Sequence, residues 1–119
     1  MIRFRTLMTI AVVGSALTVV APAGAAPPKL VGTVGPGFTI TLKRFGKPLK
    51  TLPAGIYSIT VTDKSDIHNF RLRGPGVNKE ITGVEFEGTK TAVVTLTKGT
   101  YTFVCDPHFT TMKGTFKVG

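Results

Sequence analysis

Apolar and polar residues alternate in short runs along most of the chain after residue 37. The runs 38–42, 57–61, 68–72, 92–96 and 101–105 each place every second side chain on one face. A repeat of two is typical of β-strands, whose successive side chains point to opposite faces. Turn sequences such as Gly74-Pro75-Gly76 separate the runs, so about seven short strands predict an all-β, antiparallel sandwich or barrel. Residues 77–87 lack a clear pattern and fit a loop, a short helix or an edge strand.

The first 25 residues have the pattern of a secretory signal peptide. Arg3 and Arg5 precede an apolar run over residues 7–20, which ends in the small-residue segment Ala23-Gly24-Ala25. The run is shorter than the about 20 residues that span a bilayer, although an uncleaved anchor is the alternative. We therefore expect residues 26–119 to form one domain, exported to the periplasm or the extracellular space, with no membrane span after removal of the signal.

The chain is strongly basic, with a formal net charge of +9, of which the predicted signal peptide carries two positive charges. A basic protein is steered toward an acidic partner or an anionic surface. Nucleic acid is not expected as a partner, because the chain has few aromatic residues and no nucleic-acid-binding motif.

The residues with metal-binding chemistry are few and close together in the predicted fold. Cys105 is the only cysteine, and His68 and His108 are the only histidines. A single cysteine cannot form an internal disulfide, and a free thiol outside the cell is oxidised unless burial or a metal protects it. The alternation places His68 and Cys105 on inward faces at strand ends, and the loop after Cys105 would bring His108 and Met112 to the same end.

The donor set of one thiolate, two imidazoles and a thioether indicates copper. Each residue alone has a simpler interpretation, such as a buried cysteine or a histidine in the core. Together, His68, Cys105, His108 and Met112 are the ligands of a blue-copper electron-transfer site, one copper per chain. Zinc is the minor alternative, since it also binds cysteine and histidine but has no use for a thioether. A single cysteine excludes an iron–sulfur cluster, and the haem-attachment motif is missing from the sequence.

The segment from Gly99 to Gly114 resembles the last ligand loop of plastocyanins and related cupredoxins, and His68-Asn69-Phe70 resembles their first-ligand segment. The resemblance implies a Greek-key β-sandwich with equatorial ligands His68, Cys105 and His108 and an axial Met112. It also implies that Asn69 ties its segment to the cysteine loop and that Tyr101 packs a corner of the sandwich. Asp106 stands where these loops often carry Ser or Thr, and its carboxylate would lower the reduction potential.

The resemblance implies a soluble, monomeric carrier of single electrons that meets its redox partner briefly. His108 would be the exposed ligand through which electrons pass, inside an apolar collar of Pro107, Phe109 and Pro75. A copper-binding or buffering protein and a metal-free structural domain are the alternatives. We do not expect an enzyme, because multicopper oxidases and nitrite reductases need further histidine ligands and this chain has two.

Overall fold

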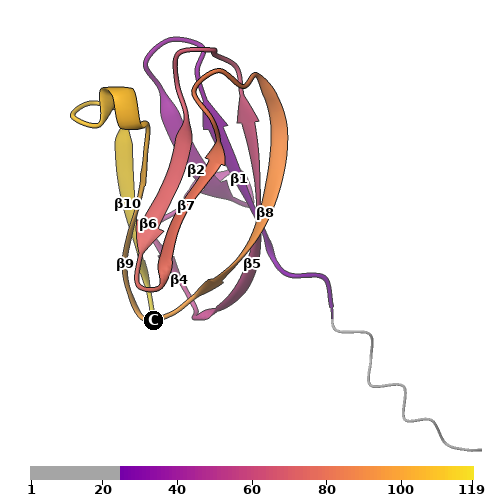
Figure 1. The fold of residues 1–119 in the computed structure, drawn as a ribbon. Coiled ribbons are helices and arrows are strands. Elements are labelled where there is room, and N and C mark those ends of the chain that lie inside the picture. Colours follow the sequence, from indigo (N-terminus) through magenta and orange to yellow (C-terminus); the bar gives the residue numbers. More distant parts are fainter. Residues whose placement is uncertain (1–24) are drawn as a thin grey trace, which may run out of the picture.

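The protein is a sandwich of two five-stranded β-sheets, seen face to face in Figure 1. The computed structural model describes residues 25–119. The predicted signal peptide lies almost wholly outside them and stays a prediction. Across the described part of the chain, no helix is long and apolar enough to span a bilayer. Every strand and every residue of the core found there lies between Lys29 and Val118.

The strands follow one another with short connections and divide between the two sheets in the orders β3-β2-β1-β5-β8 and β4-β10-β9-β6-β7. In chain order they are β1 (Lys29–Val34), β2 (Ile40–Arg44), β3 (Lys47–Pro48), β4 (Thr51–Leu52), β5 (Gly55–Asp63), β6 (Phe70–Gly74), β7 (Val77–Thr82), β8 (Gly88–Leu96), β9 (Gly99–Val104) and β10 (Lys113–Val118). The all-β sandwich predicted from the alternation is confirmed. Two pairs, β1–β5 and β4–β10, are parallel, and the other pairs are antiparallel.

Residues 25–119 form ten strands, whereas the sequence pattern indicated about seven. The additional strands are those with weak patterns. β3 and β4 have two residues each, too few for a visible period. β7 is an edge strand with the exposed polar residues Asn78, Lys79 and Glu80, so it shows no alternation. Part of the segment 77–87, which the sequence left ambiguous, is therefore an edge strand.

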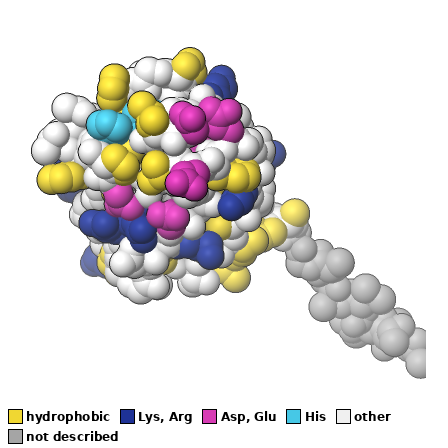
Figure 2. Space-filling model, turned by 45° about the horizontal axis from the view of Figure 1, so that its top comes forward, with side chains coloured by type: hydrophobic (Ala, Val, Ile, Leu, Met, Phe, Trp, Pro, Cys, Tyr) yellow, Lys and Arg dark blue, Asp and Glu magenta, His cyan; other side chains and the backbone are white. Residues whose placement is uncertain are grey.

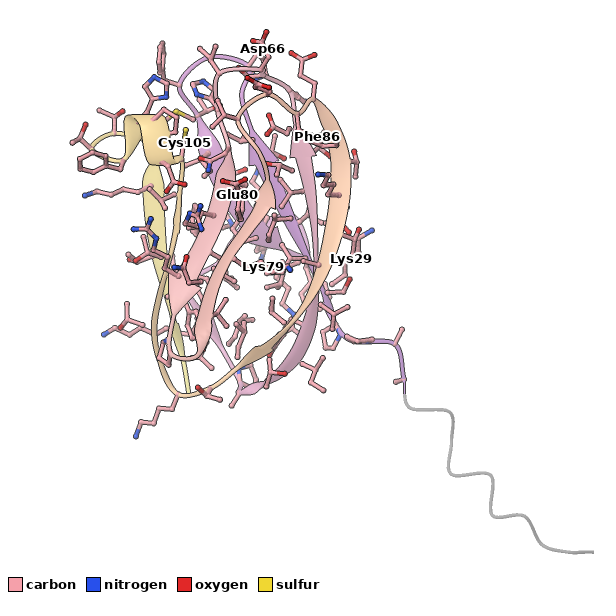
Figure 3. The ribbon with its side chains drawn as sticks, in the orientation of Figure 1. Lys29, Asp66, Lys79, Glu80, Phe86 and Cys105 are labelled. Atoms are coloured by element: carbon pink, nitrogen blue, oxygen red, sulfur yellow. The ribbon has the colours of Figure 1, made fainter. Side chains whose placement is uncertain are left out.

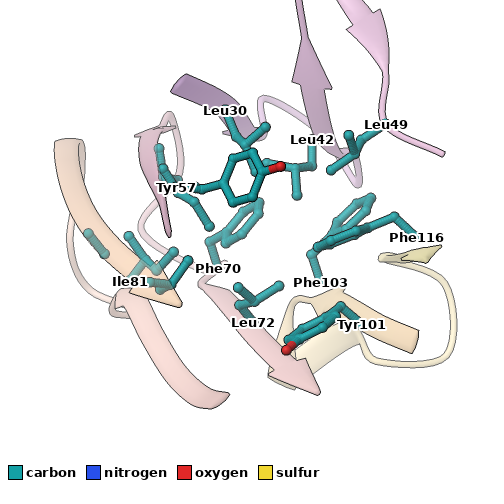
Figure 4. Close-up of a cluster of buried hydrophobic side chains, with 14 of the residues drawn as sticks. Leu30, Leu42, Leu49, Tyr57, Phe70, Leu72, Ile81, Tyr101, Phe103 and Phe116 are labelled. Carbon is teal, nitrogen blue, oxygen red and sulfur yellow. The ribbon is translucent and has the colours of Figure 1, made fainter. Parts of the chain in front are cut away.

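The core fills the space between the sheets with aromatic and aliphatic side chains (Figure 4). The rings of Phe70 and Phe103 stack at 6.0 Å, and those of Tyr101 and Phe116 at 5.5 Å. Such pairs add to the stabilisation that burial alone provides. Alternation was misleading at Phe38, which the run 38–42 placed on the same strand face as the buried Leu42 but which is 64% exposed. The reason is that β2 begins only at Ile40, so Phe38 belongs to a loop.

Four loops gather at one end of the sandwich, at the top of Figure 1. They comprise residues 35–39, 64–69, 83–87 and 105–112. β1, β5, β7 and β9 run toward this end, and the strands that follow the loops run away from it. The residues with metal-binding chemistry all lie in two of these loops, 64–69 and 105–112.

Tyr101 fixes the opposite end, as the resemblance implied. Its ring is buried, and its hydroxyl donates to the Pro75 carbonyl at 2.8 Å and accepts from the Thr97 amide at 3.0 Å.

We expect Tyr101→Phe to lower the free energy of unfolding by about 1–3 kcal/mol, because a buried amide and carbonyl lose their partner. Tyr57→Phe, which loses one bond to the Pro53 carbonyl, is the control and should cost less. Urea denaturation measures both, and equal stability of Tyr101→Phe and wild type would contradict the assignment.

Asp63, at the end of β5, is a buried carboxylate. Burial raises its pKa, and this outweighs the lowering by the hydrogen bond that its Oδ1 accepts from the Ser65 amide at 3.1 Å. The folded chain therefore binds the proton more tightly than the unfolded chain, and stability falls as pH rises from the ordinary pKa through the raised one.

We expect Asp63→Asn to raise the melting temperature at pH 7 and to lose that advantage near pH 3. Thermal melts of the metal-free protein at both pH values test this, and a gain that is independent of pH would contradict it.

Candidate metal centre

His68, Cys105 and His108 converge at the end of the sandwich where the four loops meet. The Sγ atom of Cys105 is 3.6 Å from Nδ1 of His68 and 3.6 Å from Nδ1 of His108, and the two nitrogens are 3.1 Å apart. The point equidistant from the three atoms lies about 2 Å from each, close to the length of metal–imidazole and metal–thiolate bonds. The predicted cluster is therefore formed, and its size fits one metal ion.

The ring of His68 is oriented by the loop between β1 and β2 of the other sheet. Its Nε2 lies 2.8 Å from the carbonyl oxygen of Gly37, an acceptor, so Nε2 carries the proton. This leaves the unprotonated Nδ1 directed at Cys105 and His108, as a ligand requires. His68 is 1% exposed and Cys105 is fully buried, which confirms that both point inward. Figure 3 shows Cys105 at the same end of the sandwich as Asp66 in the His68 loop.

The 105–112 loop is closed by its own backbone hydrogen bonds. It contains a short 3₁₀-helix, η1 (Asp106–His108), in which the His108 amide donates to the Cys105 carbonyl at 3.1 Å. The Met112 amide donates to the His108 carbonyl at 2.8 Å, and the Cys105 amide donates to the Met112 carbonyl at 3.0 Å. These bonds join the ends of the loop, and they hold Met112, which is 1% exposed, inside it.

A polar network ties this loop to the first-ligand segment. The Asp106 amide donates to Oδ1 of Asn69 at 2.7 Å, and Nδ2 of Asn69 donates to Asp106 at 2.7 Å and to Glu80 at 3.0 Å. Arg71 and Arg73 also bind the Asp106 carboxylate, at 2.7 and 3.2 Å. Burial alone would raise the pKa of Asp106, but the bonds from Arg71 and Asn69 and both arginine charges outweigh it, so its pKa is lowered. The arginines also offset the negative charge that we expected to lower the reduction potential.

Phe38 is a site residue that the sequence pattern missed. Its ring meets the rings of His68 and His108 edge to face, with centroids 5.4 and 4.9 Å away. It follows directly after Gly37, the partner of His68, so one loop orients the buried ligand His68 and covers the half-buried ligand His108. The only signal in the sequence was the turn Gly35-Pro36-Gly37, which argued that the strand had not yet begun.

The apolar collar around His108 differs in one member from the one expected. Phe109 and Pro107 flank the histidine and are exposed. Pro75 does not belong to it, because it follows β6 at the far end of the sandwich and its carbonyl binds Tyr101. Phe38 contacts the ring of His108 where we expected Pro75 to contribute.

Comparisons with known proteins identify the class of this centre. The family described as copper binding proteins, plastocyanin/azurin family, matches residues 39–119, whereas no curated protein matches the sequence. Rusticyanin from Thiobacillus ferrooxidans superposes with a TM-score of 0.56 at 25% identity, covering 76% of each chain. A rusticyanin variant gives 0.57 at 25% identity and the same coverage. An oxidised amicyanin variant gives 0.51 at 16% identity, covering 82% of this chain and 88% of amicyanin. The chain therefore belongs to the plastocyanin/azurin family of copper binding proteins, and copper is the metal of its His68, Cys105 and His108 centre.

Proposed function

We propose that the protein is an exported, monomeric carrier of single electrons and not an enzyme. The observation that carries the proposal is the arrangement of its ligands, two buried in the sandwich and one at its edge. Copper bound there would supply a centre that changes oxidation state by one electron. The chain's own residues hold the ligands in place and expose one of them.

The ligands are held by bonds that do not depend on the oxidation state of a metal. Gly37 fixes the ring of His68, Asn69 fixes the loop after Cys105, and the backbone of the loop fixes His108. An electron can be transferred quickly only if the surrounding groups move little when the charge changes. A site whose ligands are already fixed by the fold meets this requirement.

His108 is the route by which we propose that electrons enter and leave. Figure 2 shows a histidine at the surface among hydrophobic side chains, and this is His108, since His68 is buried. Phe38 and Phe109, 64% and 63% exposed, lie beside it. A small apolar surface around the exposed ligand suits a brief encounter with a redox partner, since such interfaces are small.

The charges beside this surface argue against the acidic partner that we inferred from the net charge. The chain has six acidic residues; five of them lie in or next to the loops of the copper end, and the sixth, Glu80 of β7, binds Asn69 and Arg71 beside it. Figure 2 shows acidic side chains grouped near the exposed histidine. The lysines of residues 25–62 lie away from this end, whereas Lys64, Lys113, Arg71 and Arg73 lie near the acids. The surface around the proposed electron route therefore carries both signs of charge, and apolar contact is the better explanation of docking there.

Titration of the metal-free protein with Cu(II), followed by visible absorption, tests the metal site. We expect an intense thiolate-to-copper charge-transfer band that saturates at one copper per chain and disappears on reduction. Cys105→Ser should abolish the band while leaving the fold intact by circular dichroism. Absence of the band would contradict a type 1 site. A band with slow electron exchange and rapid loss of copper to a chelator would favour copper buffering over electron transfer.

Met112 is the axial ligand that we propose, and its replacement tests this by electrochemistry. Leucine offers no donor atom, and loss of an axial donor destabilises Cu(II) more than Cu(I), because Cu(II) carries the higher charge. Met112→Leu should therefore raise the reduction potential by about 60 mV, equal to a tenfold change for one electron. Met112→Gln should lower it, because an amide oxygen is a harder donor. Phe116→Leu, a change in the core outside the loop, is the control. A potential unchanged in both Met112 variants would show that Met112 is only a core residue.

A further inference from the structure

The hairpin of β2 and β3 turns through an unusual residue. Arg44 pairs with Lys47, so Phe45 and Gly46 form a two-residue loop. Both have positive φ, 53° and 73°, as a type I′ turn requires. The first position of this turn favours Asn, Asp or Gly, and a bulky residue there is an outlier. Local stability therefore does not explain a phenylalanine at position 45.

Packing does not explain Phe45 either. Its side chain is 87% exposed, more than that of any other large hydrophobic residue described. The contact that the structure gives it is the guanidinium of Arg44, 4.9 Å from its ring centroid. An exposed cation–π contact of this kind contributes little to stability. A side chain that neither the turn nor the core requires is a candidate for binding something outside the chain.

Basic residues surround the hairpin. Lys43, Lys47 and Lys50 are exposed, and Lys117 of β10 lies beside Lys50, whose carbonyl accepts the Lys117 amide. Residues 25–62 contain no acidic residue. In the part of the chain that the structure describes, the ion pairs involve Arg71 and Arg73, and none involves these lysines. The hairpin therefore presents uncompensated positive charge around an exposed aromatic ring.

The hairpin lies away from the copper end. β2 starts next to Phe38, which contacts the ligand rings, and runs to Arg44 before the turn. Five residues of strand separate the two by about 17 Å. Contact made through Phe45 would leave His108 accessible, so this surface has a different use from the proposed electron route.

We propose that the hairpin Lys43–Lys50 binds the surface of an anionic phospholipid membrane, with Phe45 inserted at the level of the headgroups. This goes beyond the proposed electron transfer and does not depend on it. Basic residues are attracted to anionic headgroups, and an aromatic side chain gains by entering the interface. A membrane fits better than an acidic protein, because a single ring on a convex turn inserts readily into a deformable surface. A stable protein interface needs roughly 800 Å² on each partner, with a complementary shape.

The test uses residues 26–119, which contain the whole described sandwich. The chain has no tryptophan, so an introduced one is the only indole fluorophore. Phe45→Trp introduces a single fluorophore at the turn. We expect its emission to shift to the blue with vesicles of phosphatidylglycerol and phosphatidylcholine in equal parts, and not with phosphatidylcholine alone. The same protein with Phe109→Trp in place of Phe45→Trp reports on the copper end and should show no shift.

Vesicle sedimentation measures the affinity of matched variants. Phe45→Asn should weaken binding about tenfold, since it removes the inserted ring. It should not lower the melting temperature, because asparagine suits the first position of the turn. Lys47→Gln and Lys50→Gln should each weaken binding about fivefold. Lys79→Gln, an equal charge change on β7 of the other sheet, should have a much smaller effect.

Three results would overturn the proposal. One is equal binding of wild type and Phe45→Asn with no blue shift at position 45, which would leave only non-specific attraction of a basic protein. The second is a blue shift from position 109 and not from position 45, which would place the copper end on the membrane. Tight, Phe45-dependent binding to an acidic protein without binding to vesicles would likewise replace the membrane by a protein partner.

Discussion

Two hydrogen bonds between Asn69 and Asp106 connect the two halves of the metal centre. One joins the Asn69 side chain to the backbone amide of Asp106, and the other joins it to the Asp106 carboxylate. Asn69 follows His68 directly, and Asp106 follows Cys105. The bonds therefore set the distance between two ligands that are 37 positions apart in sequence. Asn69 is fully buried, so its bonds do not compete with water.

The network around these bonds makes a buried polar cluster tolerable. An isolated carboxylate next to a thiolate would be unfavourable, because two negative groups would share a site of low dielectric constant. Arg71 and Arg73, from the strand that follows His68, neutralise Asp106. The loop before β2 completes the centre from the other sheet, since Gly37 binds His68 and Phe38 covers both rings. Both sheets thus contribute to the centre, although its ligands all lie in the loops that adjoin the strands β6, β9 and β10 of one sheet.

The ligands could be predicted from the sequence because they are rare and lie at strand ends. Alternation placed His68 and Cys105 inward, and both are buried. Contacts between loops could not be predicted in the same way. Phe38 was assigned to a strand because its neighbours alternate, although it lies in the loop and Thr39 separates it from β2. Pro75 was placed in the apolar collar by the resemblance, yet it follows β6 at the other end of the sandwich. Periodicity gives the face of a residue and does not say at which end of a strand a loop lies.

Net charge, like periodicity, does not say where on the molecule a group lies. It sums groups that the fold separates, with the acids at the copper end and the lysines of the β2–β3 hairpin away from it. Electrostatic attraction falls off within about 10 Å in physiological salt, so each surface responds mainly to its own charges. An electron carrier must release its partner quickly, which favours an apolar and weakly charged contact around His108. Strong positive charge would slow that release if it lay there, whereas on the hairpin, in the binding mode that we propose, it would attract the protein to an anionic surface and leave His108 free.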